Sequence, residues 1–207
     1  CGSSTDQKNL KRLFGEQKAS MVYSDPPYNI NLNYSKGIGG KKDYGGNVND
    51  KRTYEEYKNF IKDTLVTALL VTNSNSHIFY WCDQSYIGLI QELYRELGIT
   101  NRRVCLWLKN SQNPTPKIAF NKCYEPVVYG TMGKPYIAPS IQNLNEVLNK
   151  EMTTGNNLFA EASDELDIWL VKRLSGQSYE HATSKPPKLH EKAIRRCTKP
   201  GDIILDS

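Results

Sequence analysis

The tetrapeptide Asp25-Pro26-Pro27-Tyr28 gathers residue types that can act together on a flat, polar ligand. It follows the apolar stretch 19–23, which predicts a short buried strand, and two consecutive prolines must end that strand. In open α/β sheets, ligands bind beyond the carboxyl ends of the strands. There the turn presents a carboxylate, the Pro26 carbonyl and an aromatic face, which suits a planar ligand with an exocyclic amino group. Taken alone, the same residues fit equally well a rigid turn with a structural tyrosine.

Alternating strands and helices are expected to position this turn. Apolar residues at helical spacing predict a helix over 54–70, which a capping box of Thr53 and Glu56 starts. A second helix is expected over 87–97, closed by Gly98, and a third over 189–197. Further strands are expected at 77–82, 104–108, 124–129 and 202–205. This alternation predicts an α/β fold with a mostly parallel sheet.

A few residues within these elements carry their own expectations. Pro126 cannot donate to a sheet ladder, so the strand over 124–129 is expected at an edge or with a bulge. Trp81 and Trp107 lie in apolar strands and are expected in the core. His77 is expected to begin a strand as a core or edge residue, and His190 to be exposed on the last helix.

The composition fits one folded domain. The chain has 207 residues, with 27 Lys and Arg against 22 Asp and Glu, a net charge of +5. This length suffices for one core. The sequence contains no run of about 18 apolar residues, and its first twenty residues lack the apolar centre of a secretory signal, so no membrane segment is expected. The mild positive charge permits a polyanionic partner without requiring one.

The cysteines are expected to be reduced thiols in a cytoplasmic protein. Their number is odd, and no two have the spacing of a CxxC motif. Both observations argue against a disulfide framework and against a zinc knuckle, so no metal site is expected. The five cysteines are Cys1, Cys82, Cys105, Cys123 and Cys197.

Two punctuated stretches interrupt the pattern. A glycine-rich, basic loop runs over 29–50, and a stretch this long without predicted structure is usually functional. Residues 134–178 are polar and are expected to form a separate lobe. We therefore expect three regions, over 1–133, 134–178 and 179–207.

The Asp25-Pro26-Pro27-Tyr28 turn, followed by Asn29, resembles the catalytic motif of amino-group DNA methyltransferases that use S-adenosylmethionine. The order of segments resembles the beta class of that family, in which this motif precedes the cofactor-binding glycine loop. The other segments that carry the resemblance are CGSSTD at 1–6, residues 77–84, LWLKN at 106–110, YEPVVYG at 124–130, HATSKP at 181–186 and KPGDIILD at 199–206.

The resemblance implies a Rossmann-like methyltransferase fold with circularly permuted motif order. It also implies that 1–133 is the catalytic region, that the polar lobe over 134–178 is a target-recognition insertion, and that 179–207 is a segment on the cofactor side. The family's glycine loop would follow Asp206, and the sequence stops at Ser207, so we expect a C-terminally truncated version of that fold that binds the cofactor poorly. The implied catalytic residues are Asp25, Pro26, Pro27 and Tyr28. The implied residues for S-adenosylmethionine are Asp25, His181, Lys185, Pro186 and Asp206. The basic candidates for DNA contacts are Lys36, Lys41, Lys42, Lys109 and Lys117.

The implied reaction is methylation of a flipped-out adenine in double-stranded DNA by a bacterial or phage enzyme. Three alternatives stay open: methylation of cytosine at N4, whose enzymes tend to carry Ser at the position of Asp25; methylation of a glutamine amide; and a non-catalytic DNA-binding remnant. The resemblance also allows a homodimer and a cognate restriction endonuclease as partners.

Overall fold

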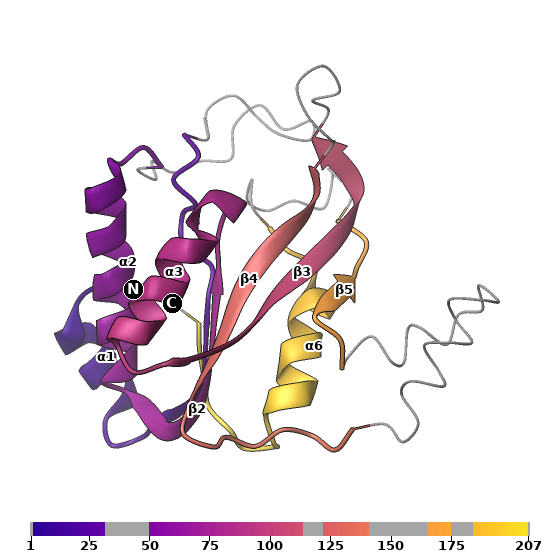
Figure 1. Cartoon of the computed structure of the whole chain (residues 1–207). Helices are drawn as coiled ribbons and strands as arrows, with labels where there is room; N and C mark the ends of the chain where they lie inside the picture. The colour runs from indigo at the N-terminus through magenta and orange to yellow at the C-terminus, as the bar shows by residue number, and fades with distance from the viewer. Residues whose placement is uncertain (1, 32–49, 114–121, 141–164, 175–183, 207) are drawn as a thin grey trace.

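A six-stranded sheet forms the centre of the protein (Figure 1). The computed structural model describes residues 2–31, 50–113, 122–140, 165–174 and 184–206. The strands, in the order β5-β3-β4-β2-β1-β6 across the sheet, are β1 (Ala19–Ser24), β2 (Thr72–Trp81), β3 (Thr100–Asn113), β4 (Lys122–Met132), β5 (Ile168–Leu170) and β6 (Ile204–Asp206). The pairs β1–β2, β1–β6 and β3–β5 are parallel, whereas β4 runs antiparallel to both β2 and β3.

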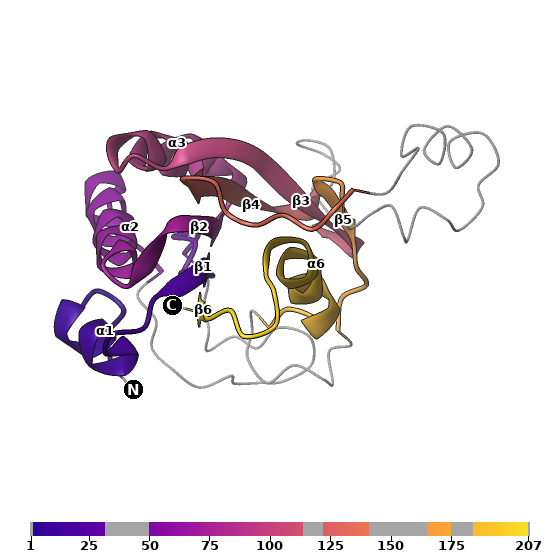
Figure 2. The ribbon, with the colours of Figure 1, turned by 90° about the horizontal axis from the view of Figure 1, so that it is seen from below.

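Helices cover both faces of the sheet (Figure 2). Residues of α1 (Gln7–Phe14), α2 (Tyr54–Leu69) and α3 (Ile87–Glu96) form one buried cluster with the sheet. The other face packs against α6 (Pro187–Cys197), and a short 3-10 helix, η2 (Gln84–Tyr86), precedes α3. None of the helices among the described residues combines the length and apolar character needed to cross a bilayer.

The predicted helices are confirmed with small differences at their ends. Thr53 caps α2: its hydroxyl accepts from the Glu56 backbone N–H, and the Glu56 carboxylate accepts from the Thr53 N–H. This is the reciprocal bonding that the two residue types predict. Gly98, with a φ of 73°, follows the end of α3. That left-handed conformation favours glycine, which explains why the helix stops there.

Two of the strand predictions need correction. The strand expected over 124–129, at an edge or with a bulge, is β4, which lies inside the sheet between β2 and β3. The edge is therefore wrong, whereas the pairing of β3 with β4 does shift register between Leu108 and Asn113, opposite Tyr124 and Lys122. The Pro126 carbonyl accepts a hydrogen bond from the backbone N–H of Cys82, the residue that follows the end of β2. The N–H that proline lacks would face the same place, where β2 has already ended, so the sheet tolerates the proline there. β5 falls within the range predicted as a polar lobe, yet it pairs with β3 in the main sheet. Its three residues are too few to give a periodic signal.

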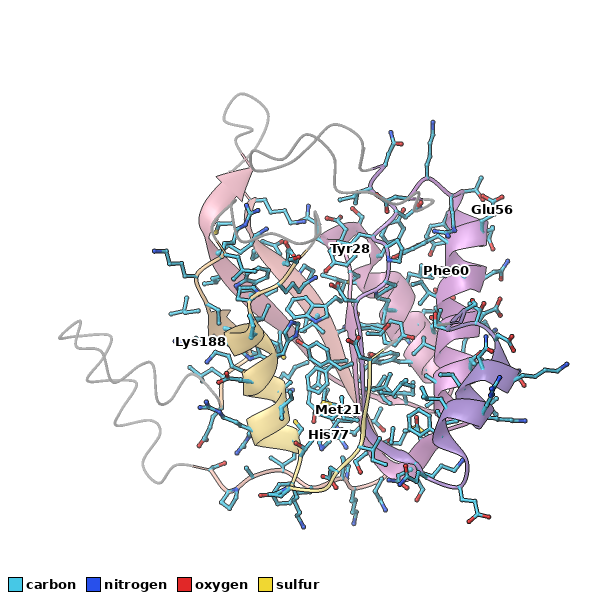
Figure 3. All side chains as sticks on the ribbon, turned by 180° about the vertical axis from the view of Figure 1, so that it is seen from behind. Met21, Tyr28, Glu56, Phe60, His77 and Lys188 are labelled. Atoms are coloured by element: carbon cyan, nitrogen blue, oxygen red, sulfur yellow. The ribbon has the colours of Figure 1, made fainter. Side chains whose placement is uncertain are left out.

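Alternation along the strands decides which residues reach the α6 face. Met21 and Tyr23 of β1 belong to the cluster under α6, whereas Val22 belongs to the cluster under α1–α3. Successive side chains of a strand point to opposite faces. The next residue on the α6 side after Tyr23 is therefore Asp25. His77, at the other end of the sheet from Tyr28 (Figure 3), is buried, as expected.

Gly130 of β4 lies where α3 packs closely on the sheet, and a substitution there tests this packing. A Cβ at this position would lie 2.7 Å from Ile99 Cγ2 and 2.8 Å from the Tyr94 ring, and both side chains are buried. We expect Gly130→Ala to lower the free energy of unfolding by about 1–3 kcal/mol in urea denaturation. Gly88, in α3, has open space around it. Gly88→Ala is the matched control and should stabilise by about 0.5–1 kcal/mol. Equal effects of the two changes would contradict this packing.

Candidate active site

The predicted catalytic turn lies where two neighbouring parallel strands end. Asp25 follows β1 directly, and Asp206 is the last residue of β6. Tyr23 of β1 is in register with Asp206, so the two carboxylates leave the sheet on the same face and at the same edge. Lys185, two residues before α6, reaches this edge and pairs with Asp25.

A pocket of about 540 Å³ opens at this edge. It brings together Asp25, Lys185 and Asp206, three of the residues expected to bind the cofactor. The complete lining is Tyr23, Asp25, Ser184, Lys185, His190, Ile194, Ile204 and Asp206. The pocket therefore combines two carboxylates with one ammonium and one imidazole.

Both carboxylate oxygens of Asp25 have a hydrogen-bond donor. The Lys185 ammonium lies 2.5 Å from Oδ2, and the Tyr28 hydroxyl donates to Oδ1 over 2.9 Å. The Asp25 side chain is 31% exposed and that of Lys185 only 4%. The lysine is thus an internal counter-ion for a carboxylate that still faces solvent.

The Lys185 ammonium is enclosed by rings and by a second acid. It lies 5.2 Å from the centre of the Tyr28 ring and 5.0 Å from that of the Trp81 ring, within the range of cation–π attraction. Glu125 Oε2 lies 3.7 Å from the same nitrogen, and Glu125 Oε1 accepts from Lys109 over 2.8 Å. Asp25, Lys185, Glu125 and Lys109 thus form a chain of alternating charges, which we call the charge chain.

The loop after the prolines is fixed by neighbouring elements. The Tyr57 hydroxyl of α2 donates to the Pro27 carbonyl over 3.0 Å. Asn29 has a φ of 57°, a conformation that asparagine tolerates better than most residues. Its side-chain amide donates to the Arg52 carbonyl and to the Tyr86 hydroxyl, and its Oδ1 accepts from the Arg52 N–H. These bonds hold the turn in place before any ligand arrives.

Burial and neighbouring charges shift the proton affinities in the site. Loss of hydration and the Asp25 carboxylate raise the pKa of Tyr28, so its hydroxyl stays protonated and can donate. Burial and the nearby Asp25 charge raise the pKa of Asp206, against an opposing effect of His190. Burial and Lys185 lower the pKa of His190, although Asp25 and Asp206 oppose them. Burial alone would raise the pKa of Glu125, but Lys185 and Lys109 outweigh it and lower that pKa.

The structure places most of the predicted residues that it describes at the pocket or beside it. Pro26 is buried in the turn, and Pro186 is buried at the N-cap of α6. Lys109 is held in the charge chain, with 14% of its side chain exposed, so a DNA contact would require it to leave Glu125. The predicted residues outside the described parts of the chain are His181, Lys36, Lys41, Lys42 and Lys117.

His190 corrects one expectation and Glu125 adds a residue that the sequence did not single out. His190 was expected to be exposed, yet it is only partly accessible, lines the pocket and packs its ring edge-on against Tyr23 at 5.3 Å. His190 lies three residues before the buried Ala193 and shares its helix face, so spacing indicated partial burial but not the pocket. Trp81 is buried as expected, but its ring also faces Lys185. Glu125 belongs to the YEPVVYG segment, and the sequence signal for a role was its charge among apolar strand residues.

The chain matches known proteins along most of its length. A family model described as DNA methylase, of the N6/N4 methyltransferase type, matches residues 19–207. The type II methyltransferase M.HpaI of Haemophilus parainfluenzae is 22% identical over 200 residues, covering 96% of this chain and 60% of that protein. The type II methyltransferase M2.DpnII of Streptococcus pneumoniae is 23% identical over 198 residues, covering 92% of this chain and 69% of that protein.

Solved structures share the fold. The PvuII DNA methyltransferase, described as cytosine-N4-specific, superposes with a TM-score of 0.65 at 17% identity, covering 99% of this chain and 71% of that one. The complex of M1.HpyAVI with S-adenosylmethionine gives 0.57 at 18% identity, covering 97% of this chain and 78% of that one. The fold is therefore the Rossmann-like methyltransferase fold that the sequence predicted.

The lowered pKa of His190 predicts a pH dependence of stability. Because the folded protein holds this proton less tightly than the unfolded chain, stability falls as the pH drops below the usual histidine value of 6.5. We expect His190→Gln to make this fall shallower below about pH 6.5, measured as urea midpoints. His77, whose pKa burial also lowers, keeps its contribution in both proteins. An unchanged pH dependence would show that His190 is not desolvated.

Proposed function

Since the chain belongs to the DNA methylase family, we propose that it transfers a methyl group from S-adenosylmethionine to the exocyclic amine of a base in duplex DNA. The observation that carries the proposal is Asp25, held at a strand end with hydrogen-bond donors on both carboxylate oxygens. A group that already accepts from an ammonium and a hydroxyl can accept from an amino group in the same place. Adenine N6 is the proposed target.

The residues around the pocket fit this cofactor. Its amino-acid end carries an ammonium and a carboxylate, and its sulfonium centre is cationic. Asp25 and Asp206 supply negative charge for the cationic groups, and Lys185 supplies a cation for the carboxylate. Burial and the Asp25 charge raise the pKa of Asp206, and a cation bound beside it would oppose this rise. His181 and Pro186 are proposed to border the same ligand.

Asp25 acts on the attacking nitrogen. The lone pair of an exocyclic amine is delocalised into the base, so the nitrogen is a weak nucleophile. Hydrogen bonds from its two hydrogens to Asp25 and to the Pro26 carbonyl favour a pyramidal nitrogen with its lone pair free. When bound, the cofactor supplies a methyl group on a sulfonium that is open to in-line attack. Asp25 then stabilises the positive charge that develops on nitrogen, and the fixed turn supplies the alignment.

The base must leave the duplex to reach Asp25. Extrusion breaks pairing and stacking, and stacking against an aromatic side chain offsets part of that loss. Tyr28 provides such a ring beside Asp25, with its hydroxyl bonded to the carboxylate. We propose that the flipped base stacks on Tyr28, and that lysines of the basic loop, with Lys109 and Lys117, contact the DNA backbone.

Cytosine N4 is the second candidate target. The PvuII enzyme, described as cytosine-N4-specific, shares the fold. Asp25 and the Pro26 carbonyl would serve either amine, because both present two hydrogens on a planar ring. The product of the reaction separates the two targets.

The same proposal extends to the setting of the protein. Region 1–133 would carry catalysis, 134–178 target recognition and 179–207 the cofactor side. Double-stranded DNA is the proposed partner, and the relatives' description as type II methyltransferases supports a restriction endonuclease beside it. A homodimer and a cytoplasmic location in a bacterial or phage-infected cell complete this proposal.

The first experiment measures methyl transfer from labelled S-adenosylmethionine to unmethylated duplex DNA by the full-length protein. Digestion to nucleosides should yield N6-methyladenine. N4-methylcytosine would establish the second candidate, and transfer to protein amides alone would refute DNA as substrate. DNA binding without transfer under any condition would support a non-catalytic remnant.

Asp25→Ala tests the catalytic carboxylate. We expect the rate of transfer to fall at least about 100-fold, because a fixed charge at the reacting nitrogen is lost. The fold should remain, since Lys185 keeps Glu125 as a nearby acid. Asp63→Asn, on the exposed face of α2, is the control and should leave the rate unchanged. Retained turnover in Asp25→Ala would remove Asp25 from the mechanism.

Two changes at Tyr28 separate the ring from the hydroxyl. Tyr28→Ala should weaken base extrusion by about 1–3 kcal/mol, measured with 2-aminopurine fluorescence in the duplex. Tyr28→Trp should be milder because it keeps an aromatic face. Tyr28→Phe should leave extrusion intact and change only the step that depends on Asp25. An alanine variant that extrudes the base as well as the parent would refute stacking.

A further inference from the structure

Lys185 has two carboxylates within reach, and only one of them is the proposed catalytic group. Its nitrogen lies 2.5 Å from Asp25 Oδ2 and 3.7 Å from Glu125 Oε2. We propose that Glu125 is the alternative partner of Lys185, a positioning residue that receives the ammonium when the target amine takes its place on Asp25. This inference rests on the proposed function, because it assigns Asp25 to the amine.

The reason for a second partner is competition for Asp25. Tyr28 donates to Oδ1 and Lys185 to Oδ2, so an incoming amino group competes with both donors for the lone pairs of this carboxylate. Tyr28 is bonded within the turn itself, whereas Lys185 comes from a segment that lies 160 residues away along the chain. The lysine is the donor that can withdraw without dismantling the turn.

A Lys185 that withdraws from Asp25 still needs a counter-charge from the protein itself, in addition to the cofactor carboxylate proposed above. Its side chain is 4% exposed, and an ammonium buried without an acid is strongly unfavourable. Trp81 and Tyr28 offer only their ring faces. Glu125 is an acid whose lowered pKa keeps it charged. A shift of the ammonium toward Glu125 therefore preserves the ion pairing while freeing an oxygen of Asp25.

The sheet holds Glu125 in position for this task. It lies on β4 in register with Trp107 of β3, on the face that packs against α6. Lys109, two residues along β3, is its diagonal neighbour and binds Oε1. The other carboxylate oxygen of Glu125, Oε2, then faces the Lys185 ammonium at 3.7 Å. Two acids and two bases alternate along the charge chain, so Lys185 can change partners without altering the net charge of the site.

The test replaces the charge of Glu125 while keeping its size. In the full-length protein we expect Glu125→Gln to lower kcat roughly 10- to 100-fold, because Lys185 then stays on Asp25. The KM for duplex DNA should stay within about threefold, and 2-aminopurine extrusion should be unchanged, since binding precedes the exchange. Glu125→Asp, which keeps the charge, should recover part of kcat.

A second ion pair in the same protein provides the matched control. Lys122 binds Asp83 over 2.6 Å, with side chains 24% and 19% exposed, so Asp83→Asn removes a comparable interaction outside the charge chain. We expect it to lower thermal stability as Glu125→Gln does, without the loss of kcat. The ¹⁵Nζ resonance of Lys185 reports the exchange directly: duplex DNA should move it in the parent protein and not in Glu125→Gln.

The outcomes distinguish this inference from the proposed function. If the parent protein methylates DNA and Glu125→Gln matches its kcat, or if the Lys185 resonance does not respond to DNA, Glu125 is not the alternative partner. An equal loss of kcat in Asp83→Asn would reduce Glu125 to a structural role and also overturn the inference. A parent protein that methylates no DNA base would remove the proposed function, and the inference with it.

Discussion

The buried ammonium of Lys185 imposes the arrangement of the site around it. A cation with so little access to water requires acids close by, and the sheet supplies them from two separate strand ends, Asp25 after β1 and Glu125 on β4. The segment that carries Lys185 then continues into α6, whose Leu189 and Ala193 are buried under the sheet. The ion pair with Asp25 thus closes the last helix onto the first strand and defines the mouth of the pocket.

The two faces of the sheet have different tasks. The cluster under α1–α3 is built from aliphatic and tyrosine side chains, and its polar groups bond to backbone or to each other, as Tyr94 does with the carbonyls of Ile78 and Val128. The α6 face carries the aromatic cluster of Phe79, Trp81 and Trp169. Toward the pocket this cluster gives way to charged groups, Asp25 and Asp206 after or at the ends of β1 and β6 and the Lys109–Glu125 pair on β3 and β4. Both faces are thus buried cores, and the candidate site lies at one edge of the α6 face.

Local signals predicted the parts of this arrangement that depend on neighbours in sequence. The two prolines marked the end of β1, and Thr53 with Glu56 marked the start of α2, because each effect acts within four residues. The register of β3 and β4 depends on pairing between distant segments, so the proximity of Lys109 and Glu125 was not visible. The edge position predicted from Pro126 was wrong for the same reason. Whether the missing N–H of this proline weakens the sheet depends on where β2 ends, and local sequence does not show that. His190 lines the pocket because α6 lies beside β1 and β6 there, which is a contact between distant segments.

The bonds that fix Asn29 also join the two ends of the basic segment between residues 31 and 50. The Asn29 N–H donates to Asp50 Oδ1 over 2.7 Å, and the Asn31 N–H donates to the Asp50 carbonyl over 2.8 Å. An insertion between two fixed ends adds only slowly to the free-energy cost of closing the loop. The intervening residues can therefore change in length and composition without moving Asp25. The bonds of Asn29 and Asn31 to Asp50 thus separate changes in this segment from the position of Asp25. New contacts with a partner could therefore evolve in the segment while the candidate site stays the same.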